Sequence, residues 1–157
     1  MKHRFVAAAL SSLFLLAGCG YDDEPTPPAA PPAAKKPASK FADAKVGHIL
    51  IGKDGKGNRQ PKIIRTKAQA LELAKSLLAD LQGGRDFLEV AAKFSDDVDA
   101  NNKPNTNCGE PGVYQGAIID GFDPAWKDAA EKTPAGTVAP EPVESTSYGY
   151  FLIKRFK

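Results

Sequence analysis

Few side chains in this sequence could do covalent or metal chemistry. The 157 residues include only two histidines, His3 and His48, and two cysteines, Cys19 and Cys108. Zinc motifs of the paired CxxC or HExxH kind therefore cannot be formed. The sequence also lacks a GxSxG nucleophile motif, a glycine-rich phosphate loop and a GxGxxG dinucleotide motif. We therefore expect no metal and no cofactor.

Two weaker hypotheses build a catalytic or a metal site on Cys108. Cys108 with His48 would make a thiol hydrolase, but nothing in the sequence indicates an activated thiol or an oxyanion hole. A metal site of Cys108, His48 and Asp97 would lack a fourth ligand and any ligand spacing. Lys and Arg number 21 against 19 Asp and Glu, a net charge of +2, so no overall field favours nucleic acid as a partner.

The first twenty residues have the pattern of a secretory leader. Two positive charges within residues 1–4 precede a 13-residue apolar stretch, which is too short to span a bilayer at about 1.5 Å per residue. Leu16-Ala17-Gly18-Cys19 resembles the bacterial lipobox, which implies a signal peptide over 1–18 and lipidation of Cys19. We expect a lipid-anchored protein of the cell envelope, in the outer membrane and facing the periplasm. An ordinary secreted protein is the alternative.

After the leader, the sequence consists of a tether and one domain, which must position the candidate residues. Residues 19–42 contain the lipidated cysteine and a tether rich in proline and alanine, which cannot bury enough apolar surface to order itself. Residues 43–157 are long enough for one hydrophobic core. Capping residues and apolar spacing of helical period predict helices over 66–83, 86–95 and 123–131.

Short apolar runs predict strands around these helices, at 46–51, 113–114 and 150–156. A long polar loop is expected over 96–111. Strands at both ends with helices between them indicate an α+β domain in which the first and last strands pair centrally.

The order and spacing of several short motifs resemble the parvulin family of peptidyl-prolyl isomerases. The resemblance covers about 110 residues, from Lys45 to Phe156. It implies a parvulin-like four-stranded antiparallel sheet wrapped by about three to four helices, with the substrate proline in a groove on the sheet. The motifs are Val46-Gly47-His48-Ile49-Leu50-Ile51, Arg65-Thr66-Lys67, Gly84-Arg85-Asp86-Phe87, Phe94-Ser95-Asp96-Asp97 and Gly149-Tyr150-Phe151-Leu152-Ile153.

The resemblance also assigns residues to a site. Phe122 and Trp126 occupy the spacing of the family's pocket for the proline ring, although two aromatic residues four apart also suit plain core packing. His48 corresponds to the family's first-strand histidine. Asp97 corresponds to a Cys or Asp beside the rotating carbonyl, and a solvated loop acid is its alternative interpretation.

Other positions follow the family less closely. Ser145 and Thr146 lie where the family often has a threonine that bonds the histidine network, with an alignment loose by one residue. Phe151 replaces the family's second histidine. Lys53, Arg59 and Lys62 belong to a basic loop that would favour Asp or Glu before proline, unless it is only a solvated surface.

The sequence therefore predicts a peptidyl-prolyl cis-trans isomerase acting on exported or envelope proteins. Rotation about a peptide bond faces a barrier of about 18 to 20 kcal/mol, and an enzyme that binds the twisted amide better than the planar one lowers it without covalent chemistry. Proline-containing polypeptides are the expected partners, and a monomer the expected state. Because of Phe151, a catalytically weak chaperone or binding module for extended segments is the alternative.

Overall fold

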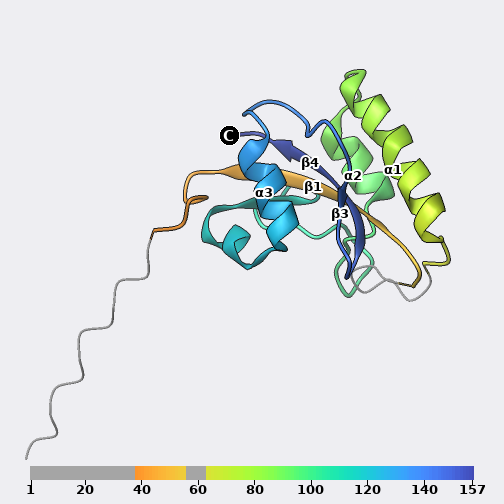
Figure 1. Ribbon diagram of the computed structural model, residues 1–157. Coiled ribbons are helices and arrows are strands. Elements are labelled where there is room, and N and C mark those ends of the chain that lie inside the picture. Colours follow the sequence, from red (N-terminus) through yellow and green to blue (C-terminus); the bar gives the residue numbers. More distant parts are fainter. Residues whose placement is uncertain (1–37, 56–62) are drawn as a thin grey trace, which may run out of the picture. The chain divides into compact units, whose positions relative to one another are not determined.

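A four-stranded antiparallel sheet organises the part of the chain that this computed structural model describes, residues 38–55 and 63–157 (Figure 1). Its strands lie in the order β2-β1-β4-β3. Their bounds are Lys45–Gly52 for β1, Val113–Gln115 for β2, Val143–Glu144 for β3 and Gly149–Arg155 for β4. The first and last strands pair at the centre, from Val46 opposite Arg155 to Gly52 opposite Gly149. The expected α+β class is confirmed.

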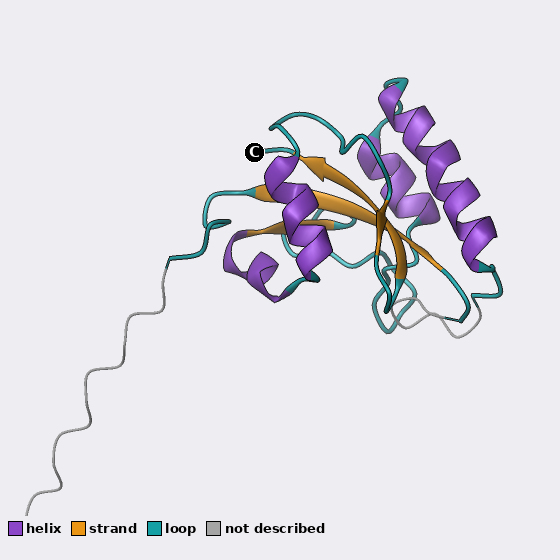
Figure 2. Ribbon diagram, viewed as in Figure 1, coloured by secondary structure: helices purple, strands orange, loops and turns teal. Residues whose placement is uncertain are grey.

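Four helical segments surround the sheet (Figure 2). α1 covers Lys67–Gln82, α2 Phe87–Phe94 and α3 Pro124–Lys132, while a short 3-10 helix, η1, covers Gly116–Gly121. The three predicted helices agree with α1, α2 and α3 within a few residues. The sequence did not predict η1 or the two-residue strand β3, because neither is long enough to show a periodic apolar pattern.

Side-chain alternation along β1 divides the core between the two faces of the sheet. Ile49 and Ile51 pack with α1 and α2 on one face, whereas Val46 and Leu50 pack with η1 and α3 on the other. Figure 1 shows α1 and α2 on the opposite side of the sheet from α3. His48 shares the α3 face with Val46 and Leu50, so this face carries the candidate chemistry.

Two glycines bring other groups close to β1. A Cβ on Gly47 would lie 2.6 Å from Phe87 Cε1 and 2.9 Å from Phe156 Cε2, so only glycine admits these rings. Gly112 has a left-handed φ of +66° and packs directly against the carbonyl of His48. The backbone N–H of His48 donates to the Gly112 carbonyl at 2.8 Å, which fixes the strand beside the loop before β2.

An ion pair joins Arg65, just before α1, to Asp96, just after α2, and both residues bond to Gly52 at the end of β1. Arg65 makes a bidentate contact with Asp96, at 2.7 and 3.0 Å, and also donates to the Gly52 carbonyl. The Gly52 N–H donates to the same Asp96 carboxylate. Burial raises the pKa of Asp96, against the lowering effect of these donors. In the described ranges, no helix combines the length and apolar character that a bilayer crossing requires.

The expected leader, Cys19 and all of the tether before residue 38 lie outside the described residues. Arg59 and Lys62 of the basic loop also lie outside them. These assignments remain predictions of the sequence.

Candidate active site

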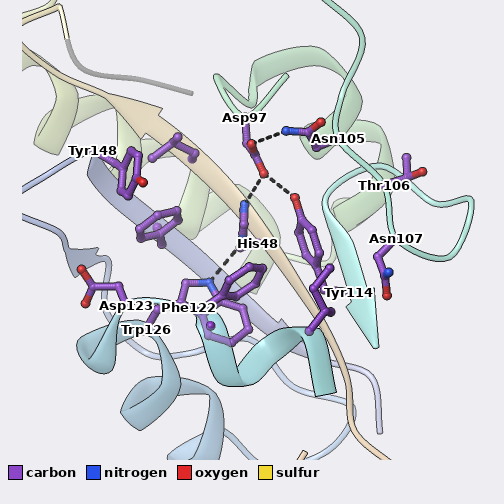
Figure 3. Close-up of a pocket in the computed structure, with 14 residues that line it drawn as sticks. His48, Asp97, Asn105, Thr106, Asn107, Tyr114, Phe122, Asp123, Trp126 and Tyr148 are labelled. Carbon is purple, nitrogen blue, oxygen red and sulfur yellow. Dashed lines mark hydrogen bonds and ion pairs between the residues drawn. The ribbon is translucent and has the colours of Figure 1, made fainter. Parts of the chain in front are cut away.

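A cavity of about 340 Å³ lies on the α3 face of the sheet (Figure 3). Its lining comes from β1, β2, β4, η1, the start of α3 and the loop after α2. The described residues that line it are His48, Leu50, Asp97, Asn105, Thr106, Asn107, Tyr114, Ile118, Gly121, Phe122, Asp123, Trp126, Tyr148 and Phe151.

Three aromatic side chains form the apolar wall. Phe122 and Trp126 meet edge to face with ring centroids 4.6 Å apart, and Phe151 lies 5.0 Å from the imidazole of His48. Trp126 is 1% exposed and Phe151 6% exposed, so both rings are fixed by the core. This wall suits a small apolar ring, because it offers aromatic surface without unpaired polar atoms.

A polar network centred on Asp97 forms the opposite wall. His48 Nε2 lies 2.7 Å from Asp97 Oδ2, and the Tyr114 hydroxyl donates to the same oxygen at 2.5 Å. Asn105 Nδ2 donates to Asp97 Oδ1 at 2.7 Å. His48 and Asp97 are 5% and 4% exposed, so the carboxylate is buried and held by three donors from three different segments.

The hydrogen bonds of His48 determine which ring nitrogen carries the proton. Trp126 Nε1 lies 3.2 Å from His48 Nδ1, and an indole N–H can only donate. Nδ1 is therefore the acceptor, and Nε2 carries the proton that it donates to Asp97. Both imidazole nitrogens are engaged, so this arrangement positions groups and does not provide a proton shuttle.

The environment of Tyr114 keeps its hydroxyl protonated. Burial raises the pKa of Tyr114 above its ordinary value, and the hydrogen bond to Asp97 raises it further. The phenol ring also stacks on His48 at a centroid distance of 5.0 Å and an interplanar angle of 27°. Tyr114 therefore orients both the carboxylate and the imidazole.

The structure brings five of the sequence-derived residues together. His48, Asp97, Phe122, Trp126 and Phe151 all line the same cavity. Besides lining the cavity, Trp126 donates its indole N–H to His48, a contact that the sequence did not indicate.

The other sequence-derived residues lie elsewhere. Ser145 is buried and its hydroxyl lies 3.2 Å from Asp123 Oδ2, so its partner is Asp123 and not His48. Thr146 is exposed and is not among the lining residues. Lys53 is 6% exposed and pairs with Glu144 at 2.8 Å, outside the cavity lining.

Sequence reasoning missed Tyr114, Asn105, Asp123 and Tyr148 as site residues. Tyr114 joins the site through the pairing of β2 with β1, where it lies opposite Val46. Alternation on a half-buried strand placed next to His48 is the signal that could have found it. The other three lie in loops and a helix cap, whose positions depend on the tertiary fold.

The constellations built on Cys108 are not assembled. The Cys108 side chain is exposed, and its sulfur lies 3.6 Å from the Val113 carbonyl, whereas the ring nitrogens of His48 contact Asp97 and Trp126. Among the described residues, no three histidine, cysteine or acidic side chains gather as a metal site would require.

Comparisons with known proteins show the family to which the chain belongs. A family model described as the PPIC-type PPIase domain matches residues 33–157. The chain therefore belongs to the PPIC-type peptidyl-prolyl isomerases, the parvulins, and the expectation of an isomerase domain is confirmed. No curated protein gives a match.

Among solved structures, the PPIase domain of TbPar42 supports the fold. The PPIase domain of TbPar42 is 23% identical with a TM-score of 0.54, over 73% of this chain and 100% of that one. The peptidylprolyl isomerase PrsA from Bacillus anthracis is 24% identical with a TM-score of 0.46, over 73% of this chain. One chain from a structure that describes PEB4 and Cj1289 of Campylobacter jejuni as SurA-like chaperones is 23% identical with a TM-score of 0.47, also over 73% of this chain. This chain spans only 42% of the PrsA chain and 39% of the Campylobacter one.

Proposed function

We propose that this protein is a lipid-anchored isomerase of X-Pro peptide bonds in exported or envelope proteins. The observation that carries the catalytic part is the pairing, in one cavity, of an aromatic wall with a buried carboxylate network. The aromatic wall of Phe122, Trp126 and Phe151 receives the pyrrolidine ring. Asp97 then lies on the side of the cavity where the preceding carbonyl turns.

The carboxylate acts through the charge of the amide. Resonance in the planar amide places negative charge on the carbonyl oxygen, and twisting the C–N bond removes that charge. A fixed negative group beside the oxygen therefore disfavours the planar form relative to the twisted one. This difference lowers the barrier, because only interactions that favour the transition state accelerate a reaction.

His48 and Tyr114 act on the substrate through Asp97. Both donate to Asp97 Oδ2, which holds the carboxylate in its ionised, hydrogen-bonded form and fixes its direction. Trp126 in turn fixes the imidazole, so the network is preorganised before the substrate binds. No group in it needs to gain or lose a proton during rotation.

The test is an isomerisation assay on the full chain, with Ala-Pro peptides and NMR exchange or a coupled protease readout. We expect acceleration over the uncatalysed rate, and a fall of about tenfold in kcat/KM for Phe122→Ala, from the loss of aromatic surface against the proline ring. Ile64→Ala is the matched control, because Ile64 is 90% exposed and outside the cavity lining. Equal rates with and without the protein would exclude catalysis.

A chaperone without efficient turnover is the second candidate, and Phe151 favours it. The ring occupies the position of the family's second histidine and adds apolar surface 5.0 Å from His48. More apolar surface strengthens binding of an extended segment whether or not its amide twists. Suppression of aggregation of an unfolded client, with no acceleration of Ala-Pro exchange, would favour this candidate.

The envelope location is supported by the sequence alone. The apolar stretch and Leu16-Ala17-Gly18-Cys19 have the pattern of a lipoprotein leader, and the proline-rich residues after it would hold the domain away from the lipid. Unfolded exported proteins, which contain X-Pro bonds that isomerise over tens to hundreds of seconds, are the substrates that such a location offers. We also propose that the protein is a monomer.

A further inference from the structure

We propose that this site prefers substrates with arginine or lysine next to the proline, and that Asp123 and Tyr148 form the subsite for the basic side chain. The inference rests on the proposed function, because it concerns the residues that flank the bound proline. It differs from the expectation for the basic loop around Lys53, which would favour an acidic neighbour.

Asp123 supplies the negative charge of the subsite. It caps α3, and its Oδ1 accepts the Ala125 N–H at 2.9 Å while its Oδ2 accepts the Ser145 hydroxyl at 3.2 Å. A carboxylate has about four acceptor positions, so two neutral donors leave room for a cation. The side chain is part-exposed in the cavity lining, where a substrate side chain can reach it.

Tyr148 supplies an aromatic face in the same part of the cavity. It is 42% exposed, which is unusual for a large aromatic side chain in this domain, and it also lines the cavity. Figure 3 shows Tyr148 and Asp123 on the side away from Thr106 and Asn107. The Ser145 contact joins Asp123 to the β3–β4 turn that carries Tyr148.

Carboxylate and aromatic face together recognise a guanidinium better than any uncharged group. The carboxylate accepts its N–H donors, and the ring attracts the cation through its quadrupole. Arginine is expected to be preferred over lysine, because its planar head can stack on the ring and bond the carboxylate at once.

The described cations around this turn have other partners. Lys53 and Lys67 both contact Glu144 at 2.8 Å, and Lys127 donates to the Asp120 carbonyl at 2.9 Å. None of them lines the cavity, whereas Asp123 does. The acidic side of the cavity is therefore not neutralised by a described ion pair.

The experiment measures kcat/KM of the full chain for two peptide series. One varies the residue before proline and the other the residue after it, each with Arg, Lys, Gln and Glu. We expect Arg over Gln to be favoured about three- to tenfold in at least one series, from a part-exposed ion pair and a cation–π contact. The preference should shrink as salt is raised.

Matched variants assign the preference to the two residues. Asp123→Asn keeps an oxygen for the helix cap but removes the charge, and should bring the Arg-to-Gln ratio close to one. Tyr148→Leu should lower the ratio about twofold, and Tyr148→Phe should retain it, because phenylalanine keeps the aromatic face. Asp128→Asn removes a charge from the same helix outside the cavity and should keep the ratio.

The Arg-to-Gln ratio of kcat/KM tests the subsite, whereas the presence of any isomerisation tests the proposed function. A ratio near one in both series, a preference for Glu, or an unchanged ratio in Asp123→Asn would overturn the subsite. If no peptide is isomerised, the proposed function fails, and the same ratio is then taken from the affinities of these peptides by NMR titration of ¹⁵N-labelled protein. Tighter binding of the Arg peptide, lost in Asp123→Asn, would still support the subsite.

Discussion

Asp97 connects the polar side of the cavity. Its two oxygens accept hydrogen bonds from His48, Tyr114 and Asn105, which come from β1, β2 and the loop between α2 and β2. A buried carboxylate is costly unless it is fully hydrogen-bonded, and these donors offset that cost. The charge and its direction are thus set by the fold before any substrate arrives.

Replacing Asp97 by asparagine tests that role. Asparagine keeps the shape, but it removes the charge and turns one acceptor into a donor that meets another donor. We expect kcat/KM for Ala-Pro peptides to fall by about 10- to 100-fold, since hydrogen bonds to charged groups contribute about 1.5–3 kcal/mol each. Asp99→Asn is the control, because the Asp99 carboxylate accepts hydrogen bonds from the loop residues Asn101 and Lys103 and does not line the cavity. An Asp97→Asn protein with the kcat/KM of the wild type would contradict the electrostatic mechanism.

Tyr114 should make the folded state sensitive to alkali. Its pKa lies above the ordinary value of 10.0 in the folded protein, so the unfolded chain loses the phenol proton first as pH rises. The stability that Tyr114 contributes is therefore complete below about pH 10 and declines above it, by up to ~1.4 kcal/mol per pH unit.

Urea unfolding of wild type and Tyr114→Phe, measured between pH 8 and pH 11, checks this slope. The variant should be less stable at neutral pH, because its ring cannot donate to Asp97, but it should lack the decline assigned to Tyr114. Parallel pH curves for the two proteins would show that Tyr114 ionises alike in both states.

At the scale of elements, the sequence predicted those parts that its local pattern determines. The Thr66 capping box and the Asp86 and Asp123 caps are present at the starts of α1, α2 and α3. The site residues Phe122, Trp126 and His48 were assigned through the resemblance to the parvulins. Asp97 was assigned in the same way.

Tertiary pairing determines the rest of the site. Tyr114 reaches Asp97 only because β2 pairs with β1 in the register that puts Tyr114 opposite Val46. Asn105 reaches Asp97 because the loop after α2 folds back on itself. The backbone N–H of Asn105 donates to the Asp97 carbonyl in this fold-back. Neither contact has a signature in the local sequence, since both join residues at least eight positions apart.

Gly47 allows α2 to pack closely on β1, and its replacement by alanine tests that contact. The added Cβ would meet Phe87 and Phe156 at 2.6 and 2.9 Å, so the rings or the strand must shift. We expect a loss of about 1–3 kcal/mol in the free energy of unfolding, as for overpacked cores. Gly121→Ala is the control for urea unfolding, because its Cβ would meet nothing within 4 Å. Equal stability of the two variants would mean that Phe87 and Phe156 can shift without a loss in the free energy of unfolding.

At the scale of the whole molecule, the described domain and the proposed anchor would have separate tasks. The described domain supplies the cavity, while the proposed lipid on Cys19 supplies the location, and Cys19 lies outside the described residues. Because each buried CH₂ contributes about 0.8 kcal/mol, several acyl chains anchor stably where a single chain binds reversibly. Location should therefore depend on one side chain that takes no part in catalysis.

Replacing Cys19 by serine should move the full chain from the membrane fraction to the soluble fraction of a bacterial host. The variant cannot carry a thioether-linked lipid, so incorporation of labelled palmitate should be lost as well. Cys108→Ser is the matched control, since it removes the other cysteine and should leave both fractionation and labelling unchanged. A wild-type protein that is already soluble, or a Cys19→Ser protein that stays with the membrane, would contradict the anchor. Ala-Pro isomerisation by the soluble variant should equal that of the wild type, because every described cavity residue follows Cys19 by at least 29 positions, from His48 onward.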